Sequence, residues 1–146
     1  MTGSTETEPL RILAVDDDAV IRSLILAILA QADDPAIRGA VLREAATLLE
    51  ARRILDSERV DLLLLDVHLP DGLGLDLAAE LRRGPADRPA IVALTASVLP
   101  ADQQAALAAG CDAFLAKPYP ATALVSLCSE LAPRRGRAVA VRSGRS

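Results

Sequence analysis

The chain has 146 residues and a net charge of −4, and 51% of its residues are hydrophobic whereas 1% are aromatic. From this length we expect one domain with an aliphatic core and no second catalytic or DNA-binding domain. The apolar runs are too short and too often interrupted by charge to cross a bilayer, and the polar N-terminus shows no secretory signal, so we expect a cytoplasmic protein without membrane contact.

The two ends of the chain have the composition of disordered segments. Residues 1–9 are polar and acidic, and residues 133–146 carry five arginines and no acid. We therefore expect a folded domain over residues 10–132, between a disordered N-terminal segment and a flexible, Arg-rich C-terminal tail. Taking the five arginines from the net charge of −4 leaves −9 on residues 1–132. This acidic balance argues against a nucleic-acid partner for the domain.

In the first half of the folded part, aliphatic runs alternate with stretches of helical spacing. Residues 11–15 predict a strand, and Asp18 can cap the helix that follows and ends at Asp33-Asp34-Pro35. A second strand is expected at residues 40–45, followed by a short helix from Thr47 through Leu55. The face of the first helix that should pack inward consists of Ile21, Leu24, Ile25, Ile28 and Leu29.

The second half continues the same alternation. Residues 60–67 predict a third strand that is buried on both faces, and Pro70-Asp71-Gly72 predicts a turn after it. The next helix should end before Gly84-Pro85, with an inner face that consists of Leu75, Leu77, Ala78 and Leu81. The remaining elements are expected in the order strand 90–95, helix 100–109 with Gly110 as its stop signal, strand 113–116 and helix 121–131.

Five repeats of a strand followed by a helix predict an α/β fold with a doubly wound parallel sheet and helices on both faces. Helix 100–109 has Leu107 as its only large apolar residue, so we expect it to pack weakly. Helix 121–131 has Glu130 as its only charged residue, which indicates either deep burial or an apolar contact surface for a weak homodimer. Cys111 and Cys128 lack metal-ligand spacing and indicate buried free thiols rather than a disulfide.

Polar and charged side chains follow four of the five predicted strands. Asp16 and Asp17 come directly after the first strand, Asp66 and Thr95 end the third and fourth, and Lys117 follows the fifth. Ligands of open α/β sheets bind outside the carboxyl ends of the strands, so we expect these side chains to meet. Adjacent carboxylates repel one another unless a cation lies between them, and Mg²⁺ prefers oxygen ligands. The pattern predicts a Mg²⁺ site where one acid takes a phosphoryl group whose oxygens the hydroxyl and ammonium bind.

Each of these residues also has a simpler interpretation. The acids at 16–18 could serve only as helix cap and dipole compensation, and Thr95 could be an ordinary strand residue. Lys117 could stand there by chance, although it is the only lysine among sixteen basic residues. The combined set favours the metal site, because an unpaired charge on Asp66, at the end of an otherwise apolar strand, would be costly to bury.

Four short motifs together resemble the receiver domain of two-component response regulators. They are Asp16-Asp17, the stretch 65–70 (Leu-Asp-Val-His-Leu-Pro) with Gly74 beyond it, the stretch 93–96 (Ala-Leu-Thr-Ala), and Lys117-Pro118. The resemblance covers residues 11–132, and the amino acids within the motifs are similar to those in receivers of hybrid histidine kinases. It implies a flavodoxin-like receiver fold, with strand order 2-1-3-4-5 and helices on both faces of the sheet.

The resemblance implies a phosphoacceptor site that depends on Mg²⁺. Asp66 would accept a phosphoryl group from a phosphohistidine. Asp17, Asp66 and the main-chain carbonyl of His68 would bind Mg²⁺ directly, and Asp16 would act largely through water. Lys117 would bind a phosphoryl oxygen.

The resemblance also implies a switch, in which Thr95 moves toward the phosphoryl group and Phe114 turns inward, so that the surface of helix 100–109 changes. Leu69 and Leu73 stand where Met and an acid are frequent, which should leave the chemistry intact. Phe114 lacks the hydroxyl that a Tyr would bring. His68 and Ser97 occupy variable positions that would tune the phosphoryl lifetime, and His68, the only histidine, fits this role better than that of a phosphorelay histidine.

The function implied is that of a signalling phosphoacceptor and not of an enzyme with a separate substrate. We expect a stand-alone response regulator that is phosphorylated by a histidine kinase or a histidine phosphotransfer protein and then alters its contact with a downstream protein. A receiver module of a hybrid kinase, a phosphorelay or a phosphate sink is the alternative. A haloacid-dehalogenase-type phosphatase with Asp16 as nucleophile is a remote one, because the sequence lacks the further acidic pair and cap insertion. A receiver-like scaffold that is never phosphorylated is disfavoured by the complete set of acids.

Overall fold

The computed structural model describes residues 8–85 and 88–132. Of the predicted terminal segments, residues 1–7 and the Arg-rich tail 133–146 lie outside the described residues. Within the described part, no helix combines the length and apolar character that crossing a membrane requires.

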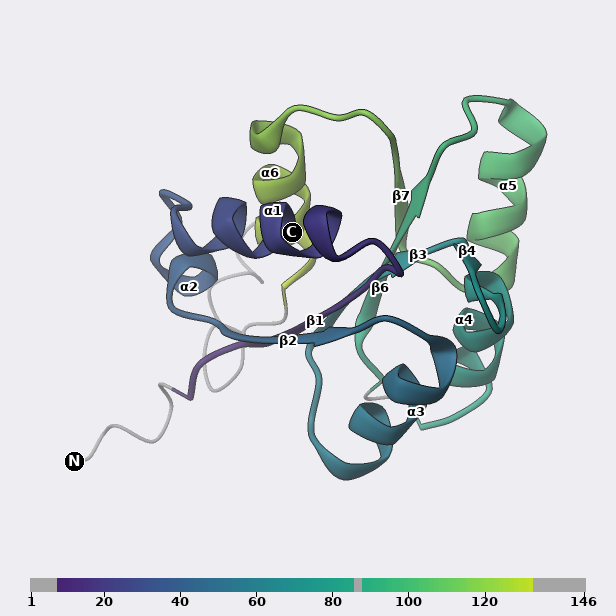
Figure 1. The fold of residues 1–146 in the computed structure, drawn as a ribbon, viewed down its shortest axis with the longest axis horizontal. Coiled ribbons are helices and arrows are strands. Elements are labelled where there is room, and N and C mark those ends of the chain that lie inside the picture. The colour runs from purple at the N-terminus through teal and green to yellow at the C-terminus, as the bar shows by residue number, and fades with distance from the viewer. Residues whose placement is uncertain (1–7, 86–87, 133–146) are drawn as a thin grey trace, which may run out of the picture.

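A five-stranded parallel sheet forms the centre of the molecule (Figure 1). Its strands lie in the order β2-β1-β3-β6-β7, which confirms the predicted order 2-1-3-4-5 once the short strands β4 and β5 are set aside. The bounds of the five strands are β1 Arg11–Val15, β2 Val41–Ala45, β3 Leu62–Asp66, β6 Ala90–Thr95 and β7 Ala113–Ala116.

Helices cover both faces of this sheet, as predicted for a doubly wound fold (Figure 1). One face packs against α1, α2 and α6, and the other packs against α3, α4 and α5. The bounds of the helices are α1 Ala19–Ala30, α2 Pro35–Arg38, α3 Leu48–Ser57, α4 Gly74–Arg82, α5 Pro100–Ala109 and α6 Ala121–Leu131.

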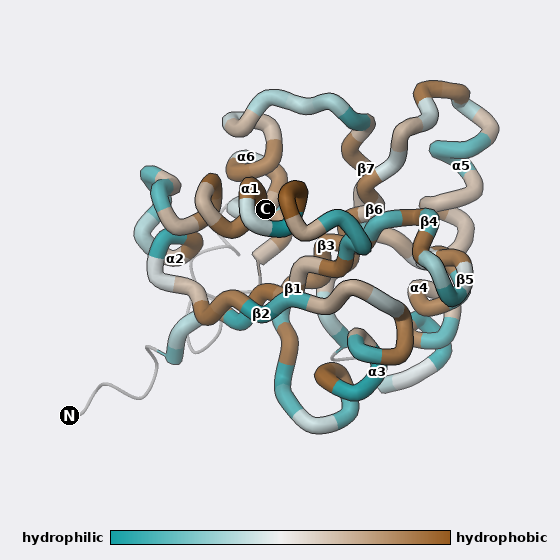
Figure 2. Tube along the Cα trace, in the orientation of Figure 1, coloured by the Kyte–Doolittle hydropathy of each residue, from teal (hydrophilic) through white to brown (hydrophobic). Residues whose placement is uncertain are grey.

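The four leucines of β3 show why the sheet lies between two helical layers. All four are at most 1% exposed, and successive side chains point to opposite faces. Leu63 and Leu65 belong to the core under α3, α4 and α5, whereas Leu62 and Leu64 belong to the core under α1 and α6. Burying one such side chain contributes about 1.5–3 kcal/mol. In Figure 2, the brown colour along the central strands marks their hydrophobic residues.

The structure differs from the sequence-based expectation in two short elements and in strand length. The helix α2, capped by Asp34, was not predicted, and neither was the antiparallel hairpin of β4 (His68–Leu69) and β5 (Gly72–Leu73). Pro70 and Asp71 form the turn of this hairpin, at the predicted place. The third strand covers residues 62–66 and not 60–67.

The prediction that Leu24 faces inward is wrong, because its side chain is 56% exposed. Ile25 and Leu29 are the buried residues of α1, and Leu24 lies at the edge of the stripe that they define. Helix α6 buries Leu124 and Cys128 and leaves Val125, Leu127 and Leu131 half-buried, which fits burial against the sheet for that side of the helix. The alternative, an apolar contact surface for a weak homodimer, stays a prediction.

Both cysteines are buried free thiols, as predicted. Cys111 lies in the core beneath α3, α4 and α5, which is called the α3–α5 face, and Cys128 lies in the core beneath α1, α2 and α6, which is called the α1–α6 face. Burial raises the pKa of Cys111 to about 11 and that of Cys128 to about 12. Such thiols have little thiolate at neutral pH and act as small apolar side chains.

Replacing Leu64 by Ala should lower the free energy of unfolding by about 2–5 kcal/mol, because it leaves a cavity in a closed core. Leu24→Ala is the matched control and should cost under about 0.5 kcal/mol, since that side chain lies largely in solvent. Urea unfolding followed by circular dichroism measures both. Equal losses would mean that Leu24 packs inward after all.

Candidate functional site

Three carboxylates meet at the edge of the sheet where the parallel strands end. Asp16 and Asp17 follow β1, Asp66 ends the neighbouring β3, and their ligand oxygens all lie within 4.8 Å of one another. Asp16 is 1% exposed and Asp66 8%, whereas Asp17 is open to solvent. The structure therefore brings together the three side chains that the sequence selected as metal ligands.

Lys117 places an ammonium group next to two of these carboxylates. It follows β7, and its Nζ lies 3.2 Å from Oδ2 of Asp16 and 3.7 Å from Oδ1 of Asp66. Its main-chain N–H donates to the carbonyl oxygen of Thr95 at 2.7 Å, which ties the end of β7 to the end of β6. The bond from Lys117 to Pro118 is cis, a question that the sequence left open.

The pKa of Asp66 is raised above its ordinary value, chiefly by burial. The charge of Asp16 raises it further, and the ammonium of Lys117 lowers it. The ammonium of Lys117 thus offsets only part of the cost of ionising Asp66. A divalent cation among the three carboxylates would remove this repulsion, and hard oxygen donors are the ligands that Mg²⁺ prefers.

Asp16 is held through every polar group that it has. Its main-chain N–H donates to the carbonyl of Ala45 at 3.1 Å, and its Oδ1 accepts from the N–H of Asp18 at 2.9 Å. Its main-chain oxygen accepts from Nη1 of Arg22 at 2.7 Å. Asp18 in turn caps α1, as predicted, by accepting from the N–H of Val20 at 2.9 Å.

Thr95 and Phe114 lie on the adjacent strands β6 and β7. Thr95 is 8% exposed, and its Oγ1 accepts from the N–H of Ser97 at 3.0 Å. The hydroxyl of Ser97 donates to Oδ2 of Asp102 at 2.6 Å, which holds the loop to the start of α5. Phe114 is half-buried and packs on the core of the α3–α5 face. Of the residues in α5, only Ala106 is buried.

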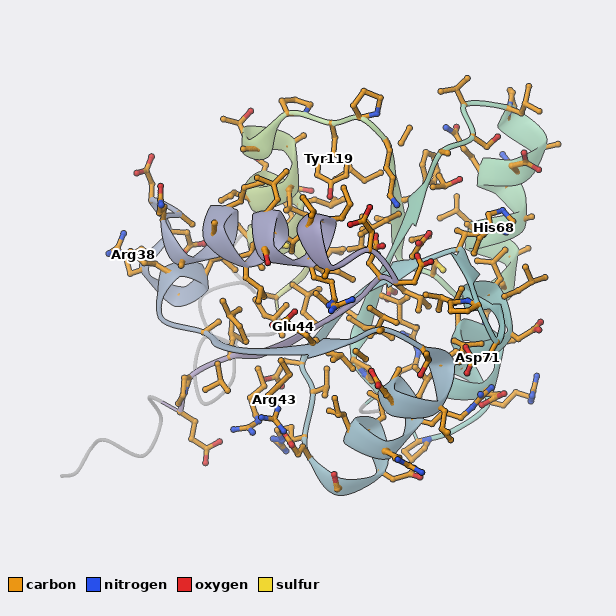
Figure 3. The ribbon with its side chains drawn as sticks, in the orientation of Figure 1. Arg38, Arg43, Glu44, His68, Asp71 and Tyr119 are labelled. Atoms are coloured by element: carbon orange, nitrogen blue, oxygen red, sulfur yellow. The ribbon has the colours of Figure 1, made fainter. Side chains whose placement is uncertain are left out.

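The side chain of His68 is exposed on the hairpin that follows Asp66 (Figure 3). Its main-chain N–H donates to Oδ1 of Asp66 at 3.3 Å. The structure thus brings the backbone of His68, but not its imidazole, into contact with the phosphoacceptor candidate.

Gly74 allows the hairpin to return close to Asp66. Its N–H donates to the carbonyl of Val67 at 2.7 Å, and a Cβ at this position would lie 2.2 Å from the main-chain oxygen of Asp66. No side chain fits in that space. This close approach explains the glycine that the motif contains.

The sequence analysis missed three residues around the site. Asp71 in the hairpin turn accepts from the N–H groups of Leu48 at 2.8 Å and Leu49 at 3.1 Å, and these bonds lower its pKa. The hairpin is thereby tied to the N-terminus of α3. Arg22 and Glu44 were also missed, since nothing in the local pattern relates α1 to β2; their contact is a product of the fold.

The family model for the response regulator receiver domain matches residues 12–129. The chain belongs to this family. The resemblance seen in the four motifs is therefore confirmed, and a receiver is a signalling phosphoacceptor module of two-component and phosphorelay systems. The phosphatase family is not the one that matches.

Three curated relatives contain a segment similar to this chain, and the share of each relative that the match covers differs widely. Hybrid signal transduction histidine kinase G of Dictyostelium discoideum is 33% identical over 119 residues, which cover 78% of this chain and 3% of that protein. The aerobic respiration control sensor protein ArcB of Escherichia coli K12 is 51% identical over 69 residues, 46% of this chain and 9% of that protein. An uncharacterized 14.6 kDa protein of Leptolyngbya boryana is 36% identical over 121 residues, 82% of this chain and 87% of that protein.

Solved structures confirm the receiver fold. A CheY-like response regulator receiver domain protein from Methanospirillum hungatei has a TM-score of 0.71 and 29% identity, over 84% of this chain and 93% of that one. A response regulator from Burkholderia pseudomallei, solved with a phosphorylated aspartic acid, a calcium ion and citrate, has a TM-score of 0.69 and 27% identity. This match covers 80% of this receiver and 65% of that chain.

Replacing Gly74 by Ala should destabilise the receiver by about 1–3 kcal/mol, because the added methyl group overlaps the main-chain oxygen of Asp66. The same change should weaken Mg²⁺ binding by displacing Asp66. Gly84→Ala is the matched control, since its Cβ would make only ordinary contacts, 3.4 Å from the nearest atom. Thermal unfolding and calorimetric titration measure the two effects; a Gly74→Ala protein that behaves like Gly84→Ala would contradict this account of the loop.

Proposed function

We propose that this receiver accepts a phosphoryl group on Asp66 from a phosphohistidine, in a Mg²⁺-dependent reaction. The donor would be a histidine kinase or a histidine phosphotransfer protein. The convergence of Asp16, Asp17 and Asp66 with the ammonium of Lys117 is the observation that carries the proposal. The phosphorylated aspartic acid and calcium ion of the Burkholderia pseudomallei regulator support it.

The donor set fits Mg²⁺, because three carboxylates offer closely spaced oxygens and Asp17 leaves one side open to solvent. Asp17 and Asp66 would hold the ion directly, with the main-chain carbonyl of His68 as a further ligand, and Asp16 would act largely through water. When bound, the ion neutralises negative charge on the phosphoryl oxygens and on the acids.

In the transfer, an oxygen of Asp66 forms a bond to phosphorus while the bond from phosphorus to the donor's imidazole nitrogen breaks. Lys117 lies 3.7 Å from Oδ1 of Asp66, so its ammonium can bind a phosphoryl oxygen at the same place. The hydroxyl of Thr95 would bind another phosphoryl oxygen, and the backbone N–H groups after Asp66 would help to hold the charge. His68 and Ser97 would tune how long the phosphoryl group persists.

Thr95 and Phe114 would convert phosphorylation into a change of surface. To reach the phosphoryl group, Thr95 must give up the hydrogen bond that its Oγ1 accepts from the N–H of Ser97 at 3.0 Å. This movement loosens the loop that Ser97 and Asp102 hold, while Phe114 turns further inward. The helix beside them, α5, is weakly anchored because it buries only Ala106. The switch would therefore alter the α5 surface and so the binding of a downstream protein.

Two exposed apolar residues on α1 support docking of a protein donor near the site. Val20 is 75% exposed and Leu24 56%, and a spacing of four residues places them on the same side of the helix. They follow Asp17 by three and seven residues along the chain. A donor that covers them would bring its phosphohistidine close to Asp66.

The relatives support two contexts for this phosphoacceptor. The Leptolyngbya boryana protein, which the match covers over 87% of its length, favours a stand-alone response regulator. Histidine kinase G and ArcB favour the alternative, a receiver module that serves a hybrid kinase in a phosphorelay or as a phosphate sink. The phosphorylation chemistry at Asp66 is the same in both contexts.

Incubation with Mg²⁺ and a small acyl phosphate should add one phosphoryl group, detected by intact-protein mass spectrometry. Asp66→Asn should abolish the addition, because the amide is not a nucleophile for phosphorus. Asp56→Asn, an exposed acid on α3, is the control and should be labelled like the wild type. Labelling that persists in Asp66→Asn would refute the assignment and point to Asp16. Chelation of the metal should reduce labelling of the wild type to the background level.

Replacing Lys117 by Arg should leave the fold intact and still weaken the response to phosphorylation. The planar guanidinium cannot occupy the position of the compact ammonium, although the charge is kept. Treatment with acyl phosphate should then cause smaller amide chemical-shift changes at Thr95, Phe114 and α5 than in the wild type. Shifts equal to those of the wild type, at equal phosphorylation, would show that the ammonium has no special role in the switch.

A further inference from the structure

Arg22 on α1 joins the backbone of the acidic site to strand β2. Its Nη1 donates to the main-chain oxygen of Asp16 at 2.7 Å, and its Nε donates to Oε1 of Glu44 at 2.9 Å. The Arg22 side chain is 16% exposed and Glu44 44%, so the guanidinium is mostly shielded from water although its carboxylate partner is not. Figure 3 shows Glu44 on the side of β2 that faces α1, opposite to its neighbour Arg43.

We propose that Arg22 and Glu44 form a clamp that positions the Asp16-Asp17 peptide for cation binding. Arg22 would be a positioning residue, since it contacts neither the cation nor the phosphoryl group. This inference rests on the proposed Mg²⁺ site and adds to it the residues that keep that site in shape.

The clamp acts on the one ligand that nothing else holds. Both carboxylate oxygens of Asp16 are held by hydrogen bonds. Oδ1 accepts from the backbone N–H of Asp18, and Oδ2 accepts from Nζ of Lys117. In the part of the chain that the structure describes, the carboxylate of Asp17 has no hydrogen bond or ion pair. Its direction is therefore set by the backbone before it, and the carbonyl that Arg22 binds belongs to the peptide between Asp16 and Asp17.

The guanidinium suits this task because two of its N–H groups reach two different acceptors in a fixed geometry. One arm holds the loop, and the other is anchored on Glu44 at the end of β2, next to Ala45, whose carbonyl accepts from the N–H of Asp16. A lysine at position 22 would keep the charge but lose the fork. Arg22 and β2 therefore fix the peptides on both sides of the Asp16 Cα.

An ordinary surface ion pair elsewhere in the chain provides a matched control. Arg52 on α3 donates with Nε and Nη2 to the two oxygens of Glu80 on α4, at 3.1 and 2.6 Å. Arg52 is 39% exposed, more than Arg22, whereas Glu80 at 43% is about as exposed as Glu44, and among the described residues Arg52 makes no hydrogen bond to the backbone of the acidic site. Its removal should affect stability slightly and the metal site not at all.

The positive charge of Arg22 and its positioning role predict opposite effects on Mg²⁺ binding when Arg22 is replaced. Loss of a positive charge near three carboxylates would by itself strengthen the binding of a cation. Loss of the clamp would weaken it, because Asp17 would no longer be held toward the ion, and changes in residues that orient metal ligands typically cost 10–100-fold in affinity. The sign of the change separates the two roles.

The test is a calorimetric titration of the full chain with Mg²⁺, together with amide NMR spectra of the metal-free protein. Arg22→Met and Arg22→Lys should each bind Mg²⁺ about tenfold more weakly and shift the amide signal of Asp17. Glu44→Gln keeps an acceptor for Nε and should stay close to the wild type. Arg52→Met should change neither readout.

Affinity that is unchanged or increased in Arg22→Met, with an unshifted Asp17 amide, would overturn the clamp. If Arg22→Met does not fold, Arg22→Lys decides in the same way. Wild-type protein that binds no Mg²⁺ and takes up no phosphoryl group would instead overturn the proposed function. Initial phosphorylation rates at saturating Mg²⁺ should recover toward the wild-type value in Arg22→Lys, since the clamp acts through the ion; a rate that stays equally low at every Mg²⁺ concentration would contradict this.

Discussion

The burial of two carboxylates at the end of an apolar sheet is the constraint on which this receiver depends. Asp16 and Asp66 are 1% and 8% exposed, and they lie at the ends of strands that are hydrogen-bonded neighbours. Ionised acids in such a place need compensation, which Lys117 and backbone N–H groups supply in part and a cation would complete. The same electrostatic demand that makes the site costly to build makes it suited to a cation and a phosphoryl group. Stability and the proposed phosphoryl transfer therefore depend on the same cluster.

The packing around this cluster is uneven, and the proposed switch depends on that difference. The leucines of β3 are enclosed by helices on both faces and give Asp66 a rigid base. The hairpin after Asp66 is tied to α3 by Asp71, and Asp16 is held from β2 and α1. By contrast, α5 buries a single alanine and its N-terminal loop depends on the hydroxyl of Ser97. In the proposed switch, a firmly packed Asp66 lies beside a weakly anchored helix, so that a change of charge at the acid would change the surface of that helix.

Most of the fold could be predicted because its elements follow from short-range patterns. Runs such as 62–65 are apolar without interruption, as strands buried on both faces must be, and the glycines and prolines mark the ends of helices. The errors lie where short-range pattern is weak. Helix α2 has four residues, too few to show a helical periodicity, and the β4–β5 hairpin has two residues in each strand. Leu24 lies at the edge of an apolar stripe whose width depends on how α1 packs against the sheet.

The sequence by itself determined which side chains gather at the site, because the carboxyl ends of parallel strands share one edge and any polar residue placed there is brought to it. It also determined the family, since the order and spacing of the four motifs are a property of the chain alone. Only the tertiary structure decided what holds those side chains in place. The contacts of Arg22 with Asp16 and Glu44, and of Asp71 with Leu48, join residues from different elements, and their partners are set by how those elements pack. Long-range contacts of this kind carry no periodicity along the chain, so the fold must exist before they can be seen.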